Sequence, residues 1–136
     1  NMQVYNRCVG TRYCSNNCPY KVRRFNWWDH QWKGPLEYMQ NPEIYVRSKG
    51  IMEKCTFCVQ RIRKAKDTAK DQNRKHKEAV DGQITPACAQ TCPTGAIVFG
   101  NILDKDSRVY QLAKKSGRSY RVFDYLGTDP SVHYLR

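Results

Sequence analysis

The spacing of the cysteines constrains this chain of 136 residues more than any other feature. The groups are Cys8-x5-Cys14-x3-Cys18-Pro19, Cys55-x2-Cys58 and Cys88-x3-Cys92-Pro93. Seven cysteines is an odd number, so a closed set of disulfides would leave one thiol over. Neither a disulfide framework nor a zinc site has a reason to repeat the proline that follows each C-x3-C pair. The spacing therefore favours thiolate ligands of another kind of metal centre.

The repeated C-x3-C-P sequence points to iron and sulfur. This is the closing half of the bacterial ferredoxin motif, in which the last cysteine ligates a different cluster from the cysteines before it. The fixed φ of proline and its missing N–H end the short turn and send the chain away from the cluster. We therefore expect an electron-transfer module that holds more than one iron–sulfur cluster.

A zinc-stabilised, basic nucleic-acid-binding module is the alternative from another class. Cys55-x2-Cys58 and the later pair resemble two zinc knuckles, and the net charge of +12 with a pI of about 9.6 suits nucleic acid. Against it stands the stretch Cys92-Pro93-Thr94-Gly95-Ala96. Lys and Arg side chains also offset the negative charge of thiolate-ligated clusters. We expect no nucleic-acid partner, and iron content with visible absorbance separates the two hypotheses.

The first cysteine group lacks one ligand of the complete ferredoxin motif. Thr11 stands where that motif has cysteine, and a threonine hydroxyl is no soft thiolate ligand at neutral pH. We expect a 3Fe–4S cluster held by Cys8, Cys14 and a third cysteine elsewhere. The alternative is a 4Fe–4S cluster with water or another non-cysteine ligand at the corner beside Thr11.

The predicted fold class is α+β, a ferredoxin-like iron–sulfur domain with short strands, cysteine loops and a few helices. We expect strands at 2–5 and 96–99, a basic helical arm over 59–80, helices at 106–116 and 120–126, and an extended tail from Pro130. We expect residues 1–100 to form the cluster-binding domain and residues 101–136 to form a C-terminal helical extension with the tail. Few residues are Leu, Ile or Val, so clusters would have to add to folding stability.

Residues 20–54 form a predicted irregular excursion without cysteine. Six of its aromatic side chains are Phe25, Trp27, Trp28, Trp32, Tyr38 and Tyr45. For any one of these rings we expect packing inside the protein. For the three tryptophans, contact with a protein or membrane surface is the alternative.

With these residues in view, the chain resembles a known family. The cysteine order is similar to that of the four-cluster ferredoxin-like subunits of polysulfide, dimethyl sulfoxide and nitrate reductases. The strings YNRCVGTRYC at 5–14, CPYKVRRFNW at 18–27 and YLGTDPSVHYL at 125–135 resemble the iron–sulfur subunit of bacterial alternative complex III.

The resemblance implies that this chain carries the last two of four cysteine groups, so that residues 1–100 would form half of a four-cluster domain. Cys8 and Cys14 would hold the 3Fe–4S cluster with an upstream cysteine, and Cys18 would complete a 4Fe–4S cluster. Cys55, Cys58 and Cys88 would hold another with one upstream ligand, and Cys92 would complete a third. The chain would then be a fragment that works with an upstream part of the same polypeptide. A purely local pairing remains open, with Cys8, Cys14 and Cys18 on one cluster and the other four cysteines on a second.

The resemblance also implies a function. Quinol would be oxidised in a polytopic membrane subunit, and electrons would pass through the clusters towards haem c subunits. The protein would lie at the membrane, peripherally, on the periplasmic side of a bacterial inner membrane, without a catalytic site of its own. Arg7, Arg12 and Lys21, with Arg23 and Arg24, are candidates for raising cluster potentials. His30, His76 and His133 are isolated in sequence and expected at the surface.

Overall fold

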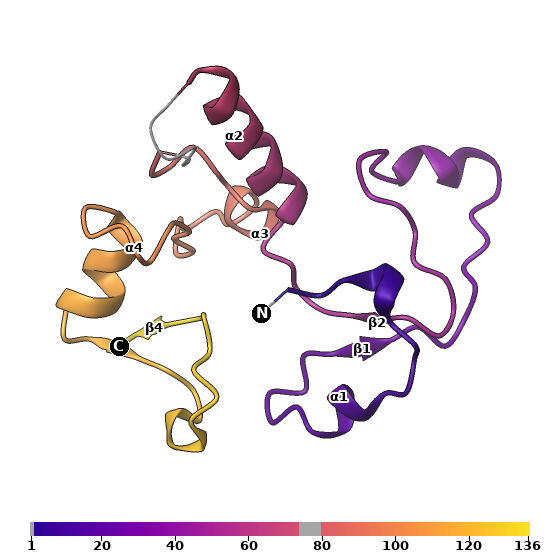
Figure 1. Ribbon diagram of the computed structural model, residues 1–136, viewed down its shortest axis with the longest axis horizontal. Coiled ribbons are helices and arrows are strands. Elements are labelled where there is room, and N and C mark those ends of the chain that lie inside the picture. The colour runs from indigo at the N-terminus through magenta and orange to yellow at the C-terminus, as the bar shows by residue number, and fades with distance from the viewer. Residues whose placement is uncertain (1, 74–79) are drawn as a thin grey trace. The chain divides into compact units, whose positions relative to one another are not determined.

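A computed structural model describes residues 2–73 and 80–136. The chain forms two compact units, Asn1–Gln60 and Arg61–Arg136, each described by itself below (Figure 1). The predicted division at residue 100 concerns the assembled four-cluster domain and stays a prediction.

The first unit is built on a two-stranded ladder that closes the base of the excursion. β1 (Arg24–Phe25) pairs antiparallel with β2 (Met52–Glu53), with Phe25 opposite Met52. Just beyond β1, the N–H of Gly50 donates to the Asn26 carbonyl over 2.8 Å. The unit also contains α1 (Tyr13–Asn16) and 3-10 helices at Tyr5–Arg7 and Gly34–Met39. The ladder thus brings the residues after Cys18 beside those before Cys55.

The strand predicted at residues 2–5 is wrong. The N–H groups of Arg7 and Cys8 bond back to the carbonyls of Val4 and Tyr5, both over 3.1 Å. These local bonds make a 3-10 turn where the expected strand would need a partner strand.

The second unit contains the longest helix and a small ribbon. α2 (Val59–Asp71) begins directly after Cys58, and α3 (Ala87–Gln90) carries Cys88. α4 (Arg108–Tyr110) continues as a π-helical turn, Gln111–Lys115. β3 (Ser119–Tyr120) and β4 (Tyr134–Leu135) pair antiparallel, and a 3-10 turn, Asp124–Leu126, lies between them.

Some predicted elements of this unit are confirmed and some are wrong. The basic helix from residue 59 is confirmed as far as Asp71, while 74–79 of the predicted arm, with His76, lie outside the described residues. The predicted helix at 106–116 is confirmed in α4 and its π-helical turn. Residues 96–99 are irregular, since no described strand pairs with them. The helix predicted at 120–126 is reduced to one turn, because Phe123 adopts a left-handed φ of 54° just before it.

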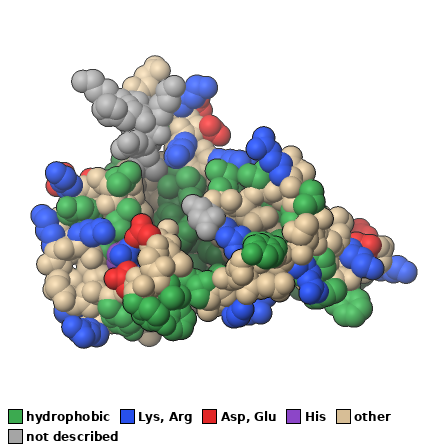
Figure 2. All heavy atoms as spheres, turned by 60° about the horizontal axis from the view of Figure 1, so that its bottom comes forward, with side chains coloured by type: hydrophobic (Ala, Val, Ile, Leu, Met, Phe, Trp, Pro, Cys, Tyr) green, Lys and Arg blue, Asp and Glu red, His purple; other side chains and the backbone are tan. Residues whose placement is uncertain are grey.

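Little of the described chain is buried. The buried apolar side chains among residues 2–73 and 80–136 are Met52, Ala65, Ala69 and Pro86. The two alanines lie four positions apart on one face of α2, as an amphipathic helix requires. Lys and Arg side chains are spread over the face drawn in Figure 2, where acidic ones are sparse.

The aromatic excursion is mostly uncovered. Phe25 is partly covered, and its ring meets the Trp27 ring edge-on at 4.8 Å. Trp28 is 70% exposed and Tyr38 is 90% exposed. Internal packing within this chain therefore accounts for Phe25 but leaves most of the other rings at the surface. Among the described residues, no helix has the length and hydropathy that a bilayer span requires.

Candidate iron–sulfur site

The loop from Cys8 to Cys14 is shaped by two left-handed residues. Gly10 has φ +76° and Arg12 has φ +63°, so Thr11 lies at a sharp turn between them. A Cβ on Gly10 would lie 2.4 Å from the Gly50 carbonyl oxygen. Only glycine therefore allows this loop to approach the base of the excursion so closely.

The sulfur of Cys8 accepts a backbone hydrogen bond from β2. The N–H of Met52 lies 3.3 Å from Cys8 Sγ, and the Met52 side chain is the largest buried one in the described chain. The ladder that buries Met52 thus also orients a donor towards a predicted cluster ligand. Such hydrogen bonds to ligating sulfurs are one way in which a protein tunes a cluster.

Three of the five predicted tuning residues, Arg7, Arg12 and Lys21, lie in different surroundings. The Arg12 guanidinium lies over the Trp27 ring, 4.4 Å from its centroid, in a cation–π contact. Lys21 has a left-handed φ of 52°, and its Nζ donates to the Asn16 carbonyl at the end of α1 over 3.0 Å. Arg7 is exposed. The structure therefore fixes Arg12 and Lys21 in place.

Cys18 lies in a cradle of backbone donors. Burial raises the pKa of its thiol, but the N–H groups of Val22, Tyr20 and Lys21, with the Arg23 charge, outweigh burial and hold that pKa below its ordinary value. These groups favour negative charge on the sulfur, as a metal-bound thiolate requires.

The Cys55–Cys58 pair immediately precedes α2. Cys55 is exposed, and its sulfur accepts the N–H of Phe57 over 3.4 Å. Phe57 and Cys58 both have positive φ, at 55° and 53°. This tight reversal between ladder and helix presents the pair as a short loop.

The Cys88–Cys92 loop is held to α2 by one arginine. Arg61 Nη1 donates to the Thr85 carbonyl over 2.5 Å and to Gln90 Oε1 over 2.9 Å. The Thr94 hydroxyl and then the N–H of Ala96 lower the pKa of the Cys92 thiol to about 7. The Thr94 oxygen lies 3.4 Å from the Cys92 sulfur. This loop too stabilises a thiolate.

The two C-x3-C-P loops repeat one backbone pattern. Each places its first cysteine on a four-residue helix, α1 or α3. The N–H of the last cysteine bonds back three residues, from Cys18 to Ser15 over 3.4 Å and from Cys92 to Ala89 over 3.3 Å. Three residues later, the left-handed Lys21 and Gly95 each donate their N–H to the cysteine carbonyl over 3.2 Å. The internal repeat suspected from the sequence is therefore present in the loop geometry.

The seven cysteines are all free, and the described residues gather no three Cys, His, Asp or Glu side chains in one place that could hold a metal. Five of the cysteines belong to the first unit and two to the second. The ligand chemistry nevertheless fits iron–sulfur clusters, because thiolates hold them and backbone N–H groups already face four of the sulfurs: Cys8, Cys18, Cys55 and Cys92. When bound, such clusters supply one-electron transfer.

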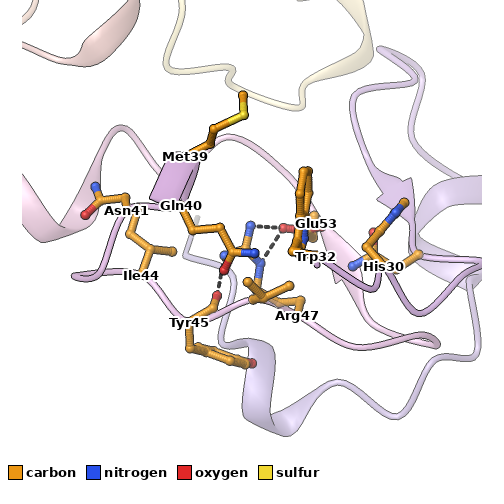
Figure 3. A pocket seen from close by; sticks show the side chains of 11 residues that line it. His30, Trp32, Met39, Gln40, Asn41, Ile44, Tyr45, Arg47 and Glu53 are labelled. Atoms are coloured by element: carbon orange, nitrogen blue, oxygen red, sulfur yellow. Dashed lines mark hydrogen bonds and ion pairs between the residues drawn. The ribbon is translucent and has the colours of Figure 1, made fainter. Parts of the chain in front are cut away.

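A separate groove runs along the excursion of the first unit. It has a volume of about 420 Å³, and its lining includes Trp32, Ile44 and Tyr45. Figure 3 shows Arg47 on its wall, where the guanidinium bonds the Tyr45 carbonyl and pairs with Glu53. Glu53 directly follows Met52, so the groove shares β2 with the donor to Cys8.

Sequence reasoning missed Met52 and Thr94 as groups acting on the sulfurs. The Met52 donor depends on contacts between distant segments and has no sequence signal. Aligning the two C-x3-C-P loops position by position would have singled out Thr94, since the loops differ there.

Cysteine loops whose sulfurs face backbone N–H donors are consistent with iron–sulfur ligation, and the known proteins that this chain resembles are iron–sulfur subunits. The chain is 44% identical over 133 residues to the iron–sulfur cluster-binding subunit of menaquinone reductase from Nitratidesulfovibrio vulgaris. It is 38% identical over 135 residues to an iron–sulfur subunit of an Hdr-like menaquinol oxidoreductase from Archaeoglobus fulgidus. It is 34% identical over 131 residues to the iron–sulfur subunit of a putative dimethyl sulfoxide reductase from Halobacterium salinarum.

These matches cover nearly the whole chain but only part of each relative. They span 98%, 96% and 96% of this chain, and 52%, 44% and 42% of the three relatives. The chain thus spans about half the length of the curated relatives it matches. No protein-family model matches it. The relatives are iron–sulfur subunits of oxidoreductases, which relates this chain to ferredoxin-type subunits and makes zinc the weaker hypothesis.

Proposed function

We propose that this chain is the cluster-binding part of a ferredoxin-like subunit that relays single electrons in a quinol oxidoreductase. The observation that carries this proposal is the similarity along nearly the whole chain to iron–sulfur subunits, together with thiolates that already accept N–H donors. Residues of the chain hold the clusters and tune them. Iron and acid-labile sulfide analysis tests the proposal first: a colourless protein loaded with zinc would contradict it.

The proposed ligand assignment shares each cluster with cysteines outside this sequence. Cys8 and Cys14 hold a 3Fe–4S cluster, and Cys18 and Cys92 each complete a 4Fe–4S cluster. Cys55, Cys58 and Cys88 hold a further 4Fe–4S cluster. The alternative is a purely local pairing, with Cys8, Cys14 and Cys18 on one cluster and the other four cysteines on a second. Mapping which cysteines contact the same cluster decides between the two assignments.

Thr11 gives the sharpest test of the assignment. In Thr11→Cys, a thiolate at the turn between Gly10 and Arg12 should capture a fourth iron, so the cluster should gain one iron and lose its three-iron spin-resonance signal. Val9→Cys is the control, because Val9 is 87% exposed in the same loop but out of ligand register. Its iron content should match that of the natural protein. A Thr11→Cys variant with unchanged iron content and spectrum would contradict the 3Fe–4S assignment.

The complex that we propose is of the alternative complex III type. A polytopic quinol-binding membrane subunit would supply electrons, haem c subunits would receive them, and the assembly would lie peripherally on the periplasmic side of a bacterial inner membrane. The strings quoted from residues 5–27 and 125–135 support this choice, as does the word menaquinol or menaquinone in the names of two relatives. Purifying the intact complex and identifying its subunits tests this assignment: a complex without haem c would contradict it.

Arg12 is the proposed tuning residue of the 3Fe–4S cluster. Its charge lies in the loop between Cys8 and Cys14, fixed against Trp27 and Phe25. Reduction adds a negative charge, so Arg12→Gln should lower the midpoint potential while Arg12→Lys should lower it less. An unchanged potential in Arg12→Gln would remove this role.

A further inference from the structure

The two matched loops surround their last cysteines with different groups. Because the backbones agree position by position, Arg23 corresponds to Ile97 and Tyr20 corresponds to Thr94. The Cys18 loop therefore has a charged side chain, Arg23, where the Cys92 loop has an alkyl side chain. The Cys92 loop has a short hydroxyl side chain, Thr94, where the Cys18 loop has a phenol ring.

In the Cys92 loop the distinctive group is a hydroxyl in contact with the sulfur. Thr94 Oγ1 lies 3.4 Å from Cys92 Sγ. An iron-bound thiolate has no proton to give, so the hydroxyl would be the donor. Ile97, in the place of the arginine, is 46% exposed and carries no charge.

In the Cys18 loop the distinctive group is a tethered cation. The hydroxyl of Ser15, on α1 between the two cysteines, donates to the Arg23 carbonyl over 3.3 Å. The guanidinium Nη1 bonds Gln3 Oε1 over 3.5 Å, and the side chain is half-buried. Arg23 is therefore held beside the loop at both its backbone and its head group, and its charge lies on the segment that directly follows Cys18.

We propose that the two repeats raise the potentials of their clusters by different physics: Arg23 acts through its charge on the cluster of Cys18, and Thr94 acts through a hydrogen bond on that of Cys92. The inference deepens the proposed electron relay and depends on it. Each group favours the reduced state, which is more negative by one charge. Charge at a distance is screened within about 10 Å at 0.1 M salt and about 3 Å at 1 M, whereas a direct hydrogen bond is not. The two effects should therefore differ in salt dependence.

The test is a redox titration of the cluster-loaded, full-length protein, followed by spin resonance at 0.1 M and 1 M salt. Cys18→Ser and Cys92→Ser assign the two signals. Arg23→Gln should lower the one-electron reduction constant of the Cys18 cluster about threefold to tenfold at 0.1 M salt, where tenfold is about 59 mV, and much less at 1 M. Thr94→Val should lower that of the Cys92 cluster by a similar factor at both salt concentrations. Each variant should leave the other cluster unchanged.

Charge-conserving and hydroxyl-conserving variants separate these roles from mere support of the fold. Arg23→Lys and Thr94→Ser should recover most of the lost potential. Lys33→Gln, which removes an exposed charge from the excursion, should shift neither cluster. Ile97→Arg places the missing charge at an exposed position and should raise the potential of the Cys92 cluster at low salt.

The inference is overturned if Arg23→Gln shifts the Cys18 cluster no more than Lys33→Gln does, or if its shift persists in full at 1 M salt. It is equally overturned if Thr94→Val leaves the Cys92 cluster unchanged. Failure of the proposed function looks different, because the natural protein would then bind no iron and show no cluster signals to titrate.

Discussion

At the scale of single residues, a few backbone conformations shape the cysteine loops. Gly10, Arg12, Lys21 and Gly95 all adopt left-handed φ at turns beside ligand positions. For Arg12 and Lys21 this conformation is strained by their Cβ atoms, and such strain gathers at functional sites. Both side chains are engaged, Arg12 on an aromatic ring and Lys21 on a helix-end carbonyl. These interactions offset part of the strain.

Gly10 offers a residue-scale prediction. Gly10→Ala should destabilise the protein by about 2 kcal/mol or more, because its Cβ adds a backbone clash to the cost of positive φ. Gly34→Ala is the control, since Gly34 also has positive φ but no atom lies within 4 Å of an added Cβ, so only about 1 kcal/mol should be lost. Urea unfolding measures both variants. Equal losses would show that the Gly10–Gly50 approach is not tight.

At the scale of elements, short segments are held by side-chain caps more than by their own length. α4 has three residues, yet it begins at a fully formed cap. The buried Ser107 hydroxyl accepts the N–H of Tyr110 over 3.2 Å and lies 2.8 Å from the Asn101 carbonyl. A helix this short is marginal alone, so the cap determines where it starts.

Ser107→Ala should therefore cost about 1–2 kcal/mol of unfolding free energy, because it leaves the Tyr110 N–H without the hydroxyl that accepts it. Ser116→Ala removes an exposed hydroxyl that bonds the Leu112 carbonyl at the other end, and it should change stability by less than about 0.5 kcal/mol. Thermal unfolding of the two variants compares them. A similar loss in both would argue against the cap.

The β3–β4 ribbon predicts a pH dependence. Burial, with the Lys114 and Arg121 charges, lowers the pKa of His133 below 6.5, and its Nδ1 lies 3.1 Å from the Ser119 hydroxyl. The folded state thus binds fewer protons than the unfolded state. His133 should contribute stability above pH 6.5 that is lost as pH falls through its lower folded pKa. In His133→Gln, the unfolding free energy should vary less with pH between about pH 7 and pH 5 than it does in the natural protein. An unchanged slope against pH would contradict this role of His133.

At the scale of the whole molecule, stability cannot come from the apolar core alone. Four buried apolar side chains among the described residues bury too little surface to order a chain of this length. Cluster ligation ties together loops that have little else to hold them. Exposed rings of the excursion and the net charge of +12 suit a chain that packs against partners.

Removing the clusters should therefore abolish cooperative unfolding. Chelation of iron under reducing conditions should flatten the urea transition and the near-ultraviolet circular dichroism of the aromatic rings, and reconstitution with iron and sulfide should restore both. The reconstituted sample controls for damage during stripping. A stripped protein that unfolds at the original midpoint would show that the fold does not depend on its clusters.

The iron–sulfur chemistry could be predicted from local sequence patterns, while the ligand role of each cysteine stays a prediction. Seven cysteines in C-x3-C-P and C-x2-C spacing predict iron–sulfur chemistry, and the relatives agree, because thiolate chemistry and local turn geometry are encoded within a few residues. α2 and the Ser107 cap were predictable for the same reason. Only the tertiary structure shows that the Met52 N–H donates to the Cys8 sulfur and that the Arg12 guanidinium lies over the Trp27 ring. It also shows that residues 2–5 lead into a 3-10 turn and do not form a paired strand. Those outcomes depend on contacts between segments far apart in the chain, which no local pattern specifies.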